Sequence, residues 1–241
     1  MKQKKQVILA VGAHPDDMDF TASGTIAKMV MEGWDAYYLI CTDGSRGSRH
    51  HKTTHEELTK TRREEQEEAG KIVGLKDIFY LDHRDTQLPC NPLLKAQIVR
   101  VIRITRPQVV ITMDPMFHYA TSSPWNRNVA FVNHTDHRAA GLATMDAVFP
   151  LSRDRLSFPE HEQQGLMPHK VSELWFTSFE KKEYVVDITK TIEKKIKALA
   201  AHKSQFDNFA KVKEEVLSHA KHFADEEEFE YAESFIRLVL D

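Results

Sequence analysis

The densest group of chemically active side chains lies in the segment AHPDDMDF at residues 13–20, which holds one histidine and three aspartates. Carboxylates this close repel one another and are costly to bury in an apolar core. His14 and Asp17 are of the residue types that bind zinc, and borderline divalent metals accept imidazole and carboxylate ligands together. Asp16 and Asp17 cannot easily share one role, so we expect one to bind metal and the other to transfer protons. An aspartate-rich turn that caps a helix is the alternative.

A second motif, NHTDH at residues 133–137, places His134 and His137 three positions apart. In a helix, side chains at this spacing lie on the same side. One histidine from this motif would complete a set of two histidines and one aspartate with the first motif. Three protein ligands and one open position are typical of a catalytic zinc site. Taken alone, the HxxH spacing fits a structural histidine pair equally well, but the two motifs together favour a metal site.

Short apolar runs alternate with helical patterns, which is typical of a parallel sheet built from βα units. Apolar runs predict strands at 7–13, 35–42, 77–82, 108–114, 172–179 and 183–188, and periodic segments predict helices at 23–33, 55–74, 92–107 and 134–149. We therefore expect a single-domain, Rossmann-like α/β fold with a mostly parallel sheet flanked by helices. In such sheets ligands bind outside the carboxyl ends of the strands. Both chemical motifs follow the carboxyl ends of predicted strands, so the fold would bring them together.

The remaining segments are expected to belong to the same domain, which spans residues 1–241. Residues 115–133 have no clean period and carry several aromatic side chains, so we expect a functional loop that governs substrate choice. The tail, from about 189 to 241, is expected to be helical, with its acidic cluster at 225–230 on a solvated face.

The turn at 13–20 is negative and lacks a glycine-rich phosphate cradle, which excludes a nucleotide-binding Rossmann domain.

Charge and composition exclude several other classes of protein. The chain carries 33 basic and 36 acidic side chains, a formal net charge of −3, with no basic block of the kind that binds nucleic acid or a membrane surface. The two cysteines imply no disulfide framework. The apolar run near the start is far shorter than the roughly 18 residues of a membrane span, and it meets HPDD at once, unlike a signal peptide. We expect a soluble, cytoplasmic protein that does not bind membranes.

Five motifs occur in a fixed order along the chain: AHPDD (13–17), TDGSRGS (42–48), TRREEQEEAGKIVGL (61–75), HTDH (134–137) and ALAAHKSQF (198–206). In this combination the chain resembles the PIG-L/LmbE-like family of zinc-dependent N-acetylglucosaminyl deacetylases, over a motif-bearing core of about residues 7–206. The resemblance implies an LmbE-like fold and a metal held by His14, Asp17 and His137.

The resemblance also implies roles for other residues of these motifs. Asp16 would be the general base, and His134 would stabilise the oxyanion or protonate the leaving amine. The family commonly has glutamate where this chain has Asp19, which is not a metal ligand in the family pattern. Arg62 aligns best with a substrate-contacting arginine of the family, although a shift of one residue would give this role to Arg63. A solvated helix face is the alternative for both arginines.

Three further side chains are candidates for contact with a sugar. Asp85 matches a family aspartate that hydrogen-bonds sugar hydroxyls, and an ordinary turn residue is the alternative. Tyr119 and Trp125 could stack on a sugar face or contact a lipophilic group, and packing within their own loop explains them equally well. His202, in the last motif, is expected to be structural.

Together these expectations describe a metal-dependent hydrolase that removes an acetyl group from an N-acetylglucosamine-type sugar or sugar conjugate, with metal-activated water as nucleophile and Asp16 as general base. The resemblance implies Zn²⁺, or another divalent transition metal, as the cofactor. It implies a small N-acetylated sugar as the partner and allows a homo-oligomer. The alternatives are a zinc amidase that acts on another small amide, such as a glucosamine–thiol conjugate, and a non-catalytic metal- or sugar-binding α/β protein. Asp16 and His134 argue against the last, because simple binding needs neither.

Overall fold

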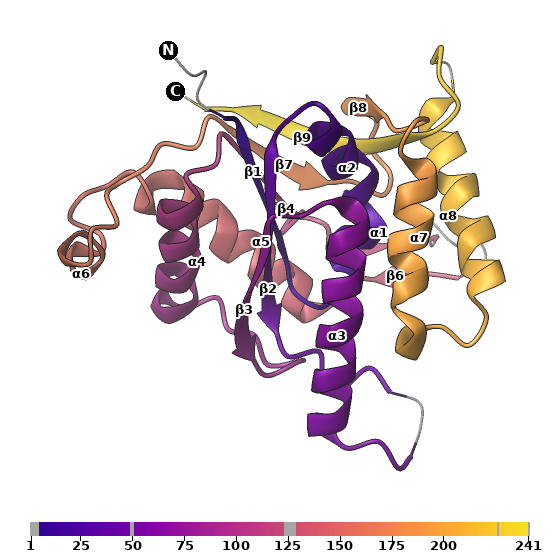
Figure 1. Cartoon of the computed structure of the whole chain (residues 1–241), viewed down its shortest axis with the longest axis horizontal. Helices are drawn as coiled ribbons and strands as arrows, with labels where there is room; N and C mark the ends of the chain where they lie inside the picture. Colours follow the sequence, from indigo (N-terminus) through magenta and orange to yellow (C-terminus); the bar gives the residue numbers. More distant parts are fainter. Residues whose placement is uncertain (1–4, 49–50, 123–128, 226, 241) are drawn as a thin grey trace.

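The computed structural model describes residues 5–48, 51–122, 129–225 and 227–240 of the chain, and seven of its strands form one sheet (Figure 1). The order across this sheet is β3-β2-β1-β4-β7-β9-β8. The strands are β1 (Val7–Gly12), β2 (Asp35–Thr42), β3 (Asp77–His83), β4 (Val109–Met113), β7 (Glu173–Thr177), β8 (Tyr184–Asp187) and β9 (Ala232–Val239). The first five strands in this order, β3, β2, β1, β4 and β7, pair in parallel, whereas β9 pairs antiparallel with β7 and with β8. The predicted fold class, a mostly parallel α/β sheet, is confirmed.

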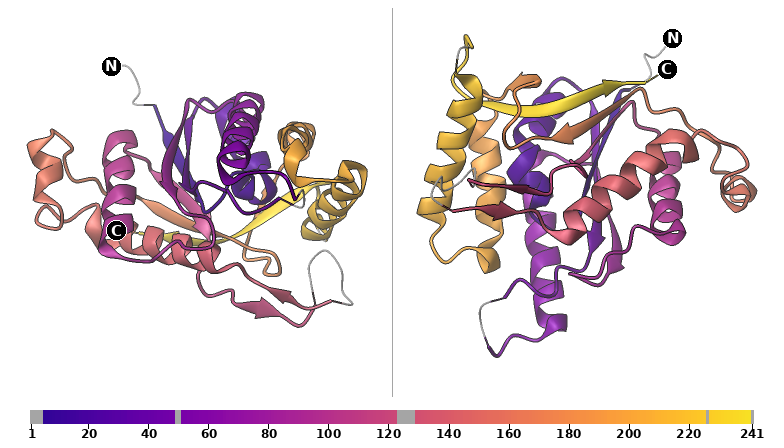
Figure 2. Two further views of the ribbon diagram at one scale, coloured as in Figure 1. Left: turned by 90° about the horizontal axis from the view of Figure 1, so that it is seen from below. Right: turned by 180° about the vertical axis from the view of Figure 1, so that it is seen from behind.

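Helices cover both faces of the sheet. On one face lie α4 (Pro92–Thr105) and α5 (Thr135–Asp146), and on the other lie α2 (Ser23–Met31), α3 (His55–Val73) and α7 (Ile192–Ala201). Figure 1 has α3 in front of the sheet, whereas the view from behind in Figure 2 has α5 in front of it. The other helical segments are α1 (Asp17–Thr21), the π-helical turn η1 (Ala147–Leu151), α6 (Pro159–Gln163), the 3-10 turn η2 (Lys203–Gln205) and α8 (Phe209–Ala224).

The apolar run of β1 contacts both helical layers. Leu9 and Val11 belong to the core formed with α4 and α5, whereas Ile8 and Ala10 belong to the core formed with α2 and α3. This alternation follows from the period of two along a strand. Burial of each such aliphatic side chain contributes about 1.5–3 kcal/mol, so charged side chains are excluded from the strand itself. The first ionisable residue therefore comes just beyond the end of β1, at the edge of the sheet.

The polar helix α3 is positioned by local signals and by one buried face. Thr54 and Glu57 form a capping box at its start, and Gly74, at φ 95°, ends it in the left-handed conformation that glycine adopts most easily. The buried side chains of this helix include the apolar Leu58 and Val73 but also two polar residues, Arg62 and Gln66. One face of α3 therefore brings polar groups into the interior beside the end of β1.

A glycine allows α5 to dock closely against the end of β4. A Cβ atom at Gly141 would lie only 2.3 Å from the carbonyl oxygen of Met113. No side chain fits in this space, so the close approach of helix and strand requires glycine. Because the HTDH motif starts α5, this contact helps to fix where the motif lies relative to the sheet.

Two predictions about the remaining segments need correction. The expected irregular loop at 115–133 contains a short two-stranded ribbon, β5 (Tyr119–Ala120) with β6 (Phe131–Val132). The expectation of a helical tail is right for α7 and α8 but wrong at its end, where β9 forms. There Phe235 is fully buried and packs against Trp175 of β7, at 5.4 Å between ring centroids. Pairing with β7, which lies far away in the sequence, determines this strand.

No helix in the described ranges of the chain is long and apolar enough to cross a bilayer.

Candidate metal centre and active site

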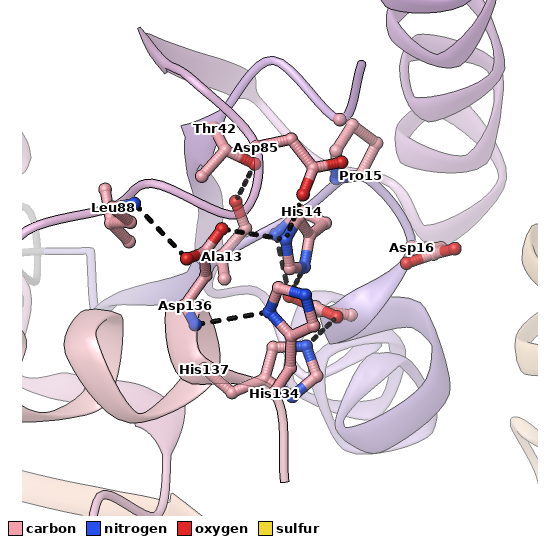
Figure 3. Close-up of polar contacts among 12 residues, drawn as sticks. Ala13, His14, Pro15, Asp16, Thr42, Asp85, Leu88, His134, Asp136 and His137 are labelled. Carbon is pink, nitrogen blue, oxygen red and sulfur yellow. Dashed lines mark hydrogen bonds and ion pairs between the residues drawn. The ribbon is translucent and has the colours of Figure 1, made fainter. Parts of the chain in front are cut away.

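Side chains from five segments meet in a pocket at the carboxyl edge of the sheet, and Figure 3 shows several of them. The turn after β1 and the start of α1 supply one histidine and two aspartates, and the start of α5 supplies two histidines. The segments after β2 and after β3 and the helix α3 supply the other charged groups. The pocket has a volume of about 280 Å³ and is lined by His14, Asp16, Asp17, Arg46, Gly47, Arg62, Asp85, Thr86, His134 and His137.

The hydrogen bonds of His14 determine which of its ring nitrogens faces the pocket. Its Nε2 lies 3.1 Å from Asp85 Oδ1 and 3.3 Å from Asp136 Oδ2. Because ionised carboxylates only accept hydrogen bonds, Nε2 carries the proton and donates it. The other nitrogen, Nδ1, lies 3.5 Å from Asp17 Oδ2. Nδ1 is therefore the ring nitrogen that His14 presents on the side of Asp17, where it could bind a metal.

His137 is oriented in the same way by a neutral partner. Its Nδ1 lies 3.0 Å from Asn133 Oδ1, and the Asn133 amide nitrogen donates to the Phe117 carbonyl at 2.7 Å. The second bond fixes the amide so that its oxygen faces His137, which makes Nδ1 the protonated nitrogen of the ring. The other ring nitrogen of His137, Nε2, then lies 3.1 Å from Asp17 Oδ1, where it could bind a metal.

Two imidazole nitrogens, one from His14 and one from His137, thus converge on the Asp17 carboxylate. In a tetrahedral site with metal–nitrogen distances of about 2.0–2.1 Å, neighbouring ligand atoms lie about 3.3 Å apart. His137 Nε2 lies 3.1 Å from Asp17 Oδ1, close to that value, and His14 Nδ1 lies 3.5 Å from the other oxygen of the same carboxylate, Oδ2. Asp17 Oδ2 also accepts the His14 backbone N–H at 2.7 Å, which leaves Oδ1 as the oxygen for a metal. The donor set fits a divalent ion.

Within the described residues, two overlapping groups of side chains have ligand atoms within 4.8 Å of one another: one of His14, His134 and His137, and one of His14, Asp85, His134 and Asp136. A cluster that could hold a metal ion is therefore present. In the second group, however, the carboxylate of Asp136 already accepts the backbone N–H groups of Thr86 and Leu88, at 2.7 and 3.2 Å. These bonds favour an orienting role for the carboxylates, which commonly lie behind metal-binding histidines.

Asp16 lies beside this cluster and is held by Arg62. The Arg62 guanidinium donates to Asp16 Oδ2 at 3.2 Å, to the Pro15 carbonyl at 2.6 Å and to the Gly44 carbonyl at 3.0 Å. Arg62 is only 4% exposed, so these bonds form away from bulk water. Its buried side chain contacts the turn after β1 as well as the pocket.

The adjacent carboxyl groups of Asp16 and Asp17 have pKa values shifted in opposite directions. Burial raises the pKa of Asp16, and the charge of Arg62 offsets this only in part. Burial also opposes ionisation of Asp17, but His137 and His14 beside the carboxylate hold its pKa well below the usual range. Such a separation is typical of sites in which one carboxylate stays ionised while the other exchanges protons.

His134 caps the first turn of α5 and remains available to a substrate. Its Nδ1 accepts the Asp136 backbone N–H at 3.2 Å, so the proton of the neutral ring is on Nε2. Burial lowers the pKa of His134, and the nearby rings of His14 and His137 lower it further. A neutral imidazole with a free Nε2–H is a hydrogen-bond donor for negative charge that develops in the pocket.

The structure places the predicted substrate-contacting residues differently from one another. Arg62 and Asp85 line the pocket. Arg63 instead pairs with Asp82 and lies over the Tyr80 ring, with its guanidinium carbon 4.2 Å from the centroid. Tyr119 is 70% exposed on β5 and does not line the pocket. The predicted Trp125 lies outside the described residues.

Several residues of the site were not predicted from the sequence. Asp136 lies inside the HTDH motif, between the two histidines that the spacing identified as candidate ligands. Asn133 precedes the same motif and orients His137. Arg46 lies in the TDGSRGS motif, and its backbone N–H donates to Asp85 Oδ2 at 3.0 Å. The sequence contained a signal for each of these residues, namely its position within or beside a recognised motif.

The fold and the site together define a class: a parallel α/β protein with a histidine–aspartate metal cluster at the carboxyl edge of its sheet. The family model described as PIG-L, GlcNAc-PI de-N-acetylase, matches residues 9–148. The chain belongs to the PIG-L family, and the family expected from the sequence motifs is confirmed.

Named relatives and a solved structure extend the similarity beyond the matched segment. Diacetylchitobiose deacetylase of Thermococcus kodakarensis is 34% identical over 203 residues, which cover 83% of this chain and 70% of that protein. Mycothiol S-conjugate amidase of Streptomyces coelicolor is 32% identical over 177 residues, which cover 64% of this chain and 55% of that protein. The structure of N,N'-diacetylchitobiose deacetylase from Pyrococcus horikoshii superposes with a TM-score of 0.87 at 28% identity, covering 98% of this chain and 85% of that one.

Proposed function

We propose that the protein is a zinc-dependent deacetylase that removes the acetyl group from an N-acetylglucosamine unit of a small sugar or sugar conjugate. The observation that carries the proposal is the convergence of His14 Nδ1, Asp17 and His137 Nε2, with Asp16 and His134 beside them. Membership of the PIG-L family and the two diacetylchitobiose deacetylase relatives support the substrate class.

His14, Asp17 and His137 would hold the metal. Each uses a nitrogen or oxygen that its other hydrogen bonds leave free, and two histidines with one carboxylate suit zinc and similar divalent ions. A bound divalent metal supplies Lewis acidity, which polarises an amide carbonyl and activates water. With three protein ligands, such a site would keep a position open for water and substrate.

The two remaining side chains of the set have complementary proton chemistry. Asp16 lines the same pocket, and its raised pKa suits a carboxylate that accepts a proton from the attacking water. The Nε2–H of His134 would donate a hydrogen bond to the oxyanion of the tetrahedral intermediate. Loss of one such donor costs about 3–4 kcal/mol of transition-state stabilisation. Return of the proton to the amide nitrogen then releases acetate and a free amine.

The shape and lining of the pocket support a small polar substrate. A volume of about 280 Å³ with charged walls suits one sugar unit rather than a polymer segment. Asp85 and the exposed Arg46 at its rim offer an acceptor and donors to sugar hydroxyls. Tyr119 and Trp125 stay predicted contacts for a part of the substrate that extends beyond the pocket.

One second candidate is an amidase that cleaves a larger acyl group from a glucosamine–thiol conjugate. The similarity to mycothiol S-conjugate amidase favours it, although that match covers only about half of the relative. The same catalytic groups would serve both reactions, because each is hydrolysis of an amide on a glucosamine nitrogen. The two functions differ in the acid that is released.

The test is amine release from a panel of N-acylated glucosamines, with metal analysis on the same preparation. The panel includes N,N'-diacetylchitobiose, N-acetylglucosamine, N-acetylglucosaminyl malate and a mycothiol S-conjugate. We expect equal amounts of acetate and free amine from at least one N-acetylated sugar, and about one zinc per chain. Amine release from the thiol conjugate alone would favour the second candidate. No amine release from any compound by the zinc-loaded protein would contradict both.

A further inference from the structure

The buried face of α3 carries a fully enclosed polar side chain, Gln66, one helical turn after Arg62. Gln66 has no exposed surface in the structure. Residues four apart on a helix share a face, so both side chains point towards the turn after β1. Burying an amide group without hydrogen-bond partners is unfavourable. The partners of Gln66 therefore indicate its role in the structure.

Gln66 connects Asp16 to a buried network. Its Oε1 accepts the Asp16 backbone N–H at 2.9 Å, and its Nε2 donates to Asp19 Oδ2 at 2.9 Å. The Asp19 carboxylate also binds His202 Nε2 at 2.9 Å and accepts from the Tyr38 hydroxyl at 3.3 Å. An ionised carboxylate accepts only, so Asp19 fixes the amide with its nitrogen inwards and its oxygen towards Asp16.

The backbone that Gln66 holds is in an unfavourable conformation. Asp16 has φ 95° and ψ −28°, in the left-handed region that residues other than glycine rarely adopt. Such a conformation is unfavourable and persists only when the surroundings of the residue impose it. Here the N–H bonds to Gln66, and the side chain bonds to Arg62. The conformation sets the direction in which the Asp16 carboxylate leaves the backbone, towards Arg62 at the wall of the pocket.

We propose that Gln66, oriented by Asp19 and His202, is a positioning residue that holds Asp16 in its left-handed conformation and so aims its carboxylate at the reacting water. The proposal rests on the base role given to Asp16 above. It assigns a shared purpose to three buried polar residues from α1, α3 and the end of α7. Asp19, which stands where the family commonly has glutamate, and His202 both act through Gln66 and do not touch substrate.

The first measurement compares kcat, KM and metal content in Gln66→Met, Gln66→Asn and a control. Methionine keeps the length of the side chain but neither accepts nor donates as the amide does. Asparagine keeps the amide but is too short to reach both Asp16 and Asp19. The matched control is Glu65→Gln, the adjacent residue of α3, which bonds Ser204 at 2.7 Å and does not contact Asp16.

We expect kcat to fall about 10- to 100-fold in both Gln66 variants, since a misplacement of about 1 Å has effects of that size. Metal content and KM should stay near those of the wild-type protein, and Glu65→Gln should keep its kcat. One folded Gln66 variant, as judged by circular dichroism and metal content, is sufficient to test the proposal. Wild-type kcat in a folded Gln66 variant overturns the proposal.

The second measurement distinguishes positioning of Asp16 from general damage to the fold. The same Gln66 variant is made in an Asp16→Asn background, where the base is already absent. We expect no further loss of kcat there, because Gln66 acts only through Asp16. Equal loss in both backgrounds overturns the proposal. Wild-type turnover in Asp16→Asn alone refutes the base role, and with it this inference, before any change at Gln66 is made.

A third readout does not require turnover. The Asp16 amide should exchange slowly with deuterium in the wild-type protein and at least tenfold faster in Gln66→Met, with no change in Glu65→Gln. Fast exchange in the wild-type protein would show that the bond to Gln66 does not hold the turn.

Discussion

At the residue scale, the two adjacent carboxylates of the first motif differ in their partners rather than in their chemistry. Asp17 faces two imidazole nitrogens, whereas Asp16 faces a guanidinium and the open pocket. A metal ion would neutralise part of the crowded negative charge, which explains how the segment tolerates it. The crowding would then be a condition for the chemistry, with one carboxylate fixed as a ligand and one free to exchange a proton.

The first prediction separates these two roles. Asp16→Asn keeps the size of the side chain but cannot accept the proton, so we expect full metal content and a loss of about 10²–10⁴ in kcat, the usual effect of removing a general base. Asp17→Asn should weaken metal binding first, with part of the activity recovered at high added zinc. Metal content and kcat are measured for both variants at one pH. Near-normal turnover of fully metal-loaded Asp16→Asn would move the base role to another residue.

The second prediction concerns the residue that orients a ligand. Asn133→Ala removes the acceptor for the Nδ1–H of His137, and loss of such a partner typically costs about 10- to 100-fold in metal affinity. Asn133→Asp keeps an oxygen there and should stay within a few-fold of the wild-type affinity. Thr135→Ala, at an exposed position of the same turn, is the control. Zinc affinity is measured by competition with a chromophoric chelator, and equal affinities for Ala and wild type would contradict the orienting role.

At the element scale, the carboxyl ends of the parallel strands bring the motifs together. The positions of these strand ends could be predicted because the local sequence determines them. The apolar run of β1 and the histidine that follows it are adjacent in the chain, as are the capping residues of α3. The strand β9 was not predictable in this way. Its sequence follows an acidic cluster, and its burial depends on Trp175 of a strand far away in the chain. The role of Gln66 was not predictable for the same reason, because its partners, Asp16 and Asp19, lie about 50 residues away in the chain.

The third prediction tests how α5 is docked. Gly141→Ala places a Cβ 2.3 Å from the Met113 carbonyl oxygen, and backbone on both sides has little freedom to move. We expect the free energy of unfolding to fall by about 1–3 kcal/mol, the usual cost of overpacking. Leu142→Ala, at the exposed neighbouring position, should change it by about 0.5 kcal/mol or less. Urea unfolding of both variants measures the effect, and equal midpoints for Gly141→Ala and wild type would show that the contact can relax freely.

At the scale of the whole molecule, we expect stability to depend on pH through one half-buried histidine of the helix α8. His219 donates from Nε2 to the Phe179 carbonyl at 3.1 Å. Burial lowers the pKa of His219 to about 4, and Lys195 and His222 nearby act in the same direction. The folded protein therefore resists a proton that the unfolded chain binds below about pH 6.5. Stability from this group is present at neutral pH and is lost as the pH falls from about 6.5 towards 4.

The fourth prediction follows from that difference. Between pH 7 and pH 5 we expect His219 to account for a loss of about 1–2 kcal/mol in the free energy of unfolding. His219→Gln keeps a donor for the Phe179 carbonyl but does not titrate, so its loss over the same interval should be smaller by that amount. Both proteins are unfolded in urea at the two pH values with the metal removed. Parallel losses in the two proteins would show that His219 titrates normally.

The last prediction links the metal site to the stability of the whole fold. The proposed ligands come from the end of β1 and the start of α5, and His14 and Asp136, which orients it, are 122 residues apart in the chain. The unfolded chain cannot hold such a set together, so zinc should bind the folded state preferentially. At 100 times the dissociation constant this contributes about 2.7 kcal/mol, which for a chain of this length raises Tm by about 5–10 °C. We expect that shift on adding zinc to chelator-treated protein, and its absence in His14→Ala. An equal shift in His14→Ala would place the stabilising zinc at another site.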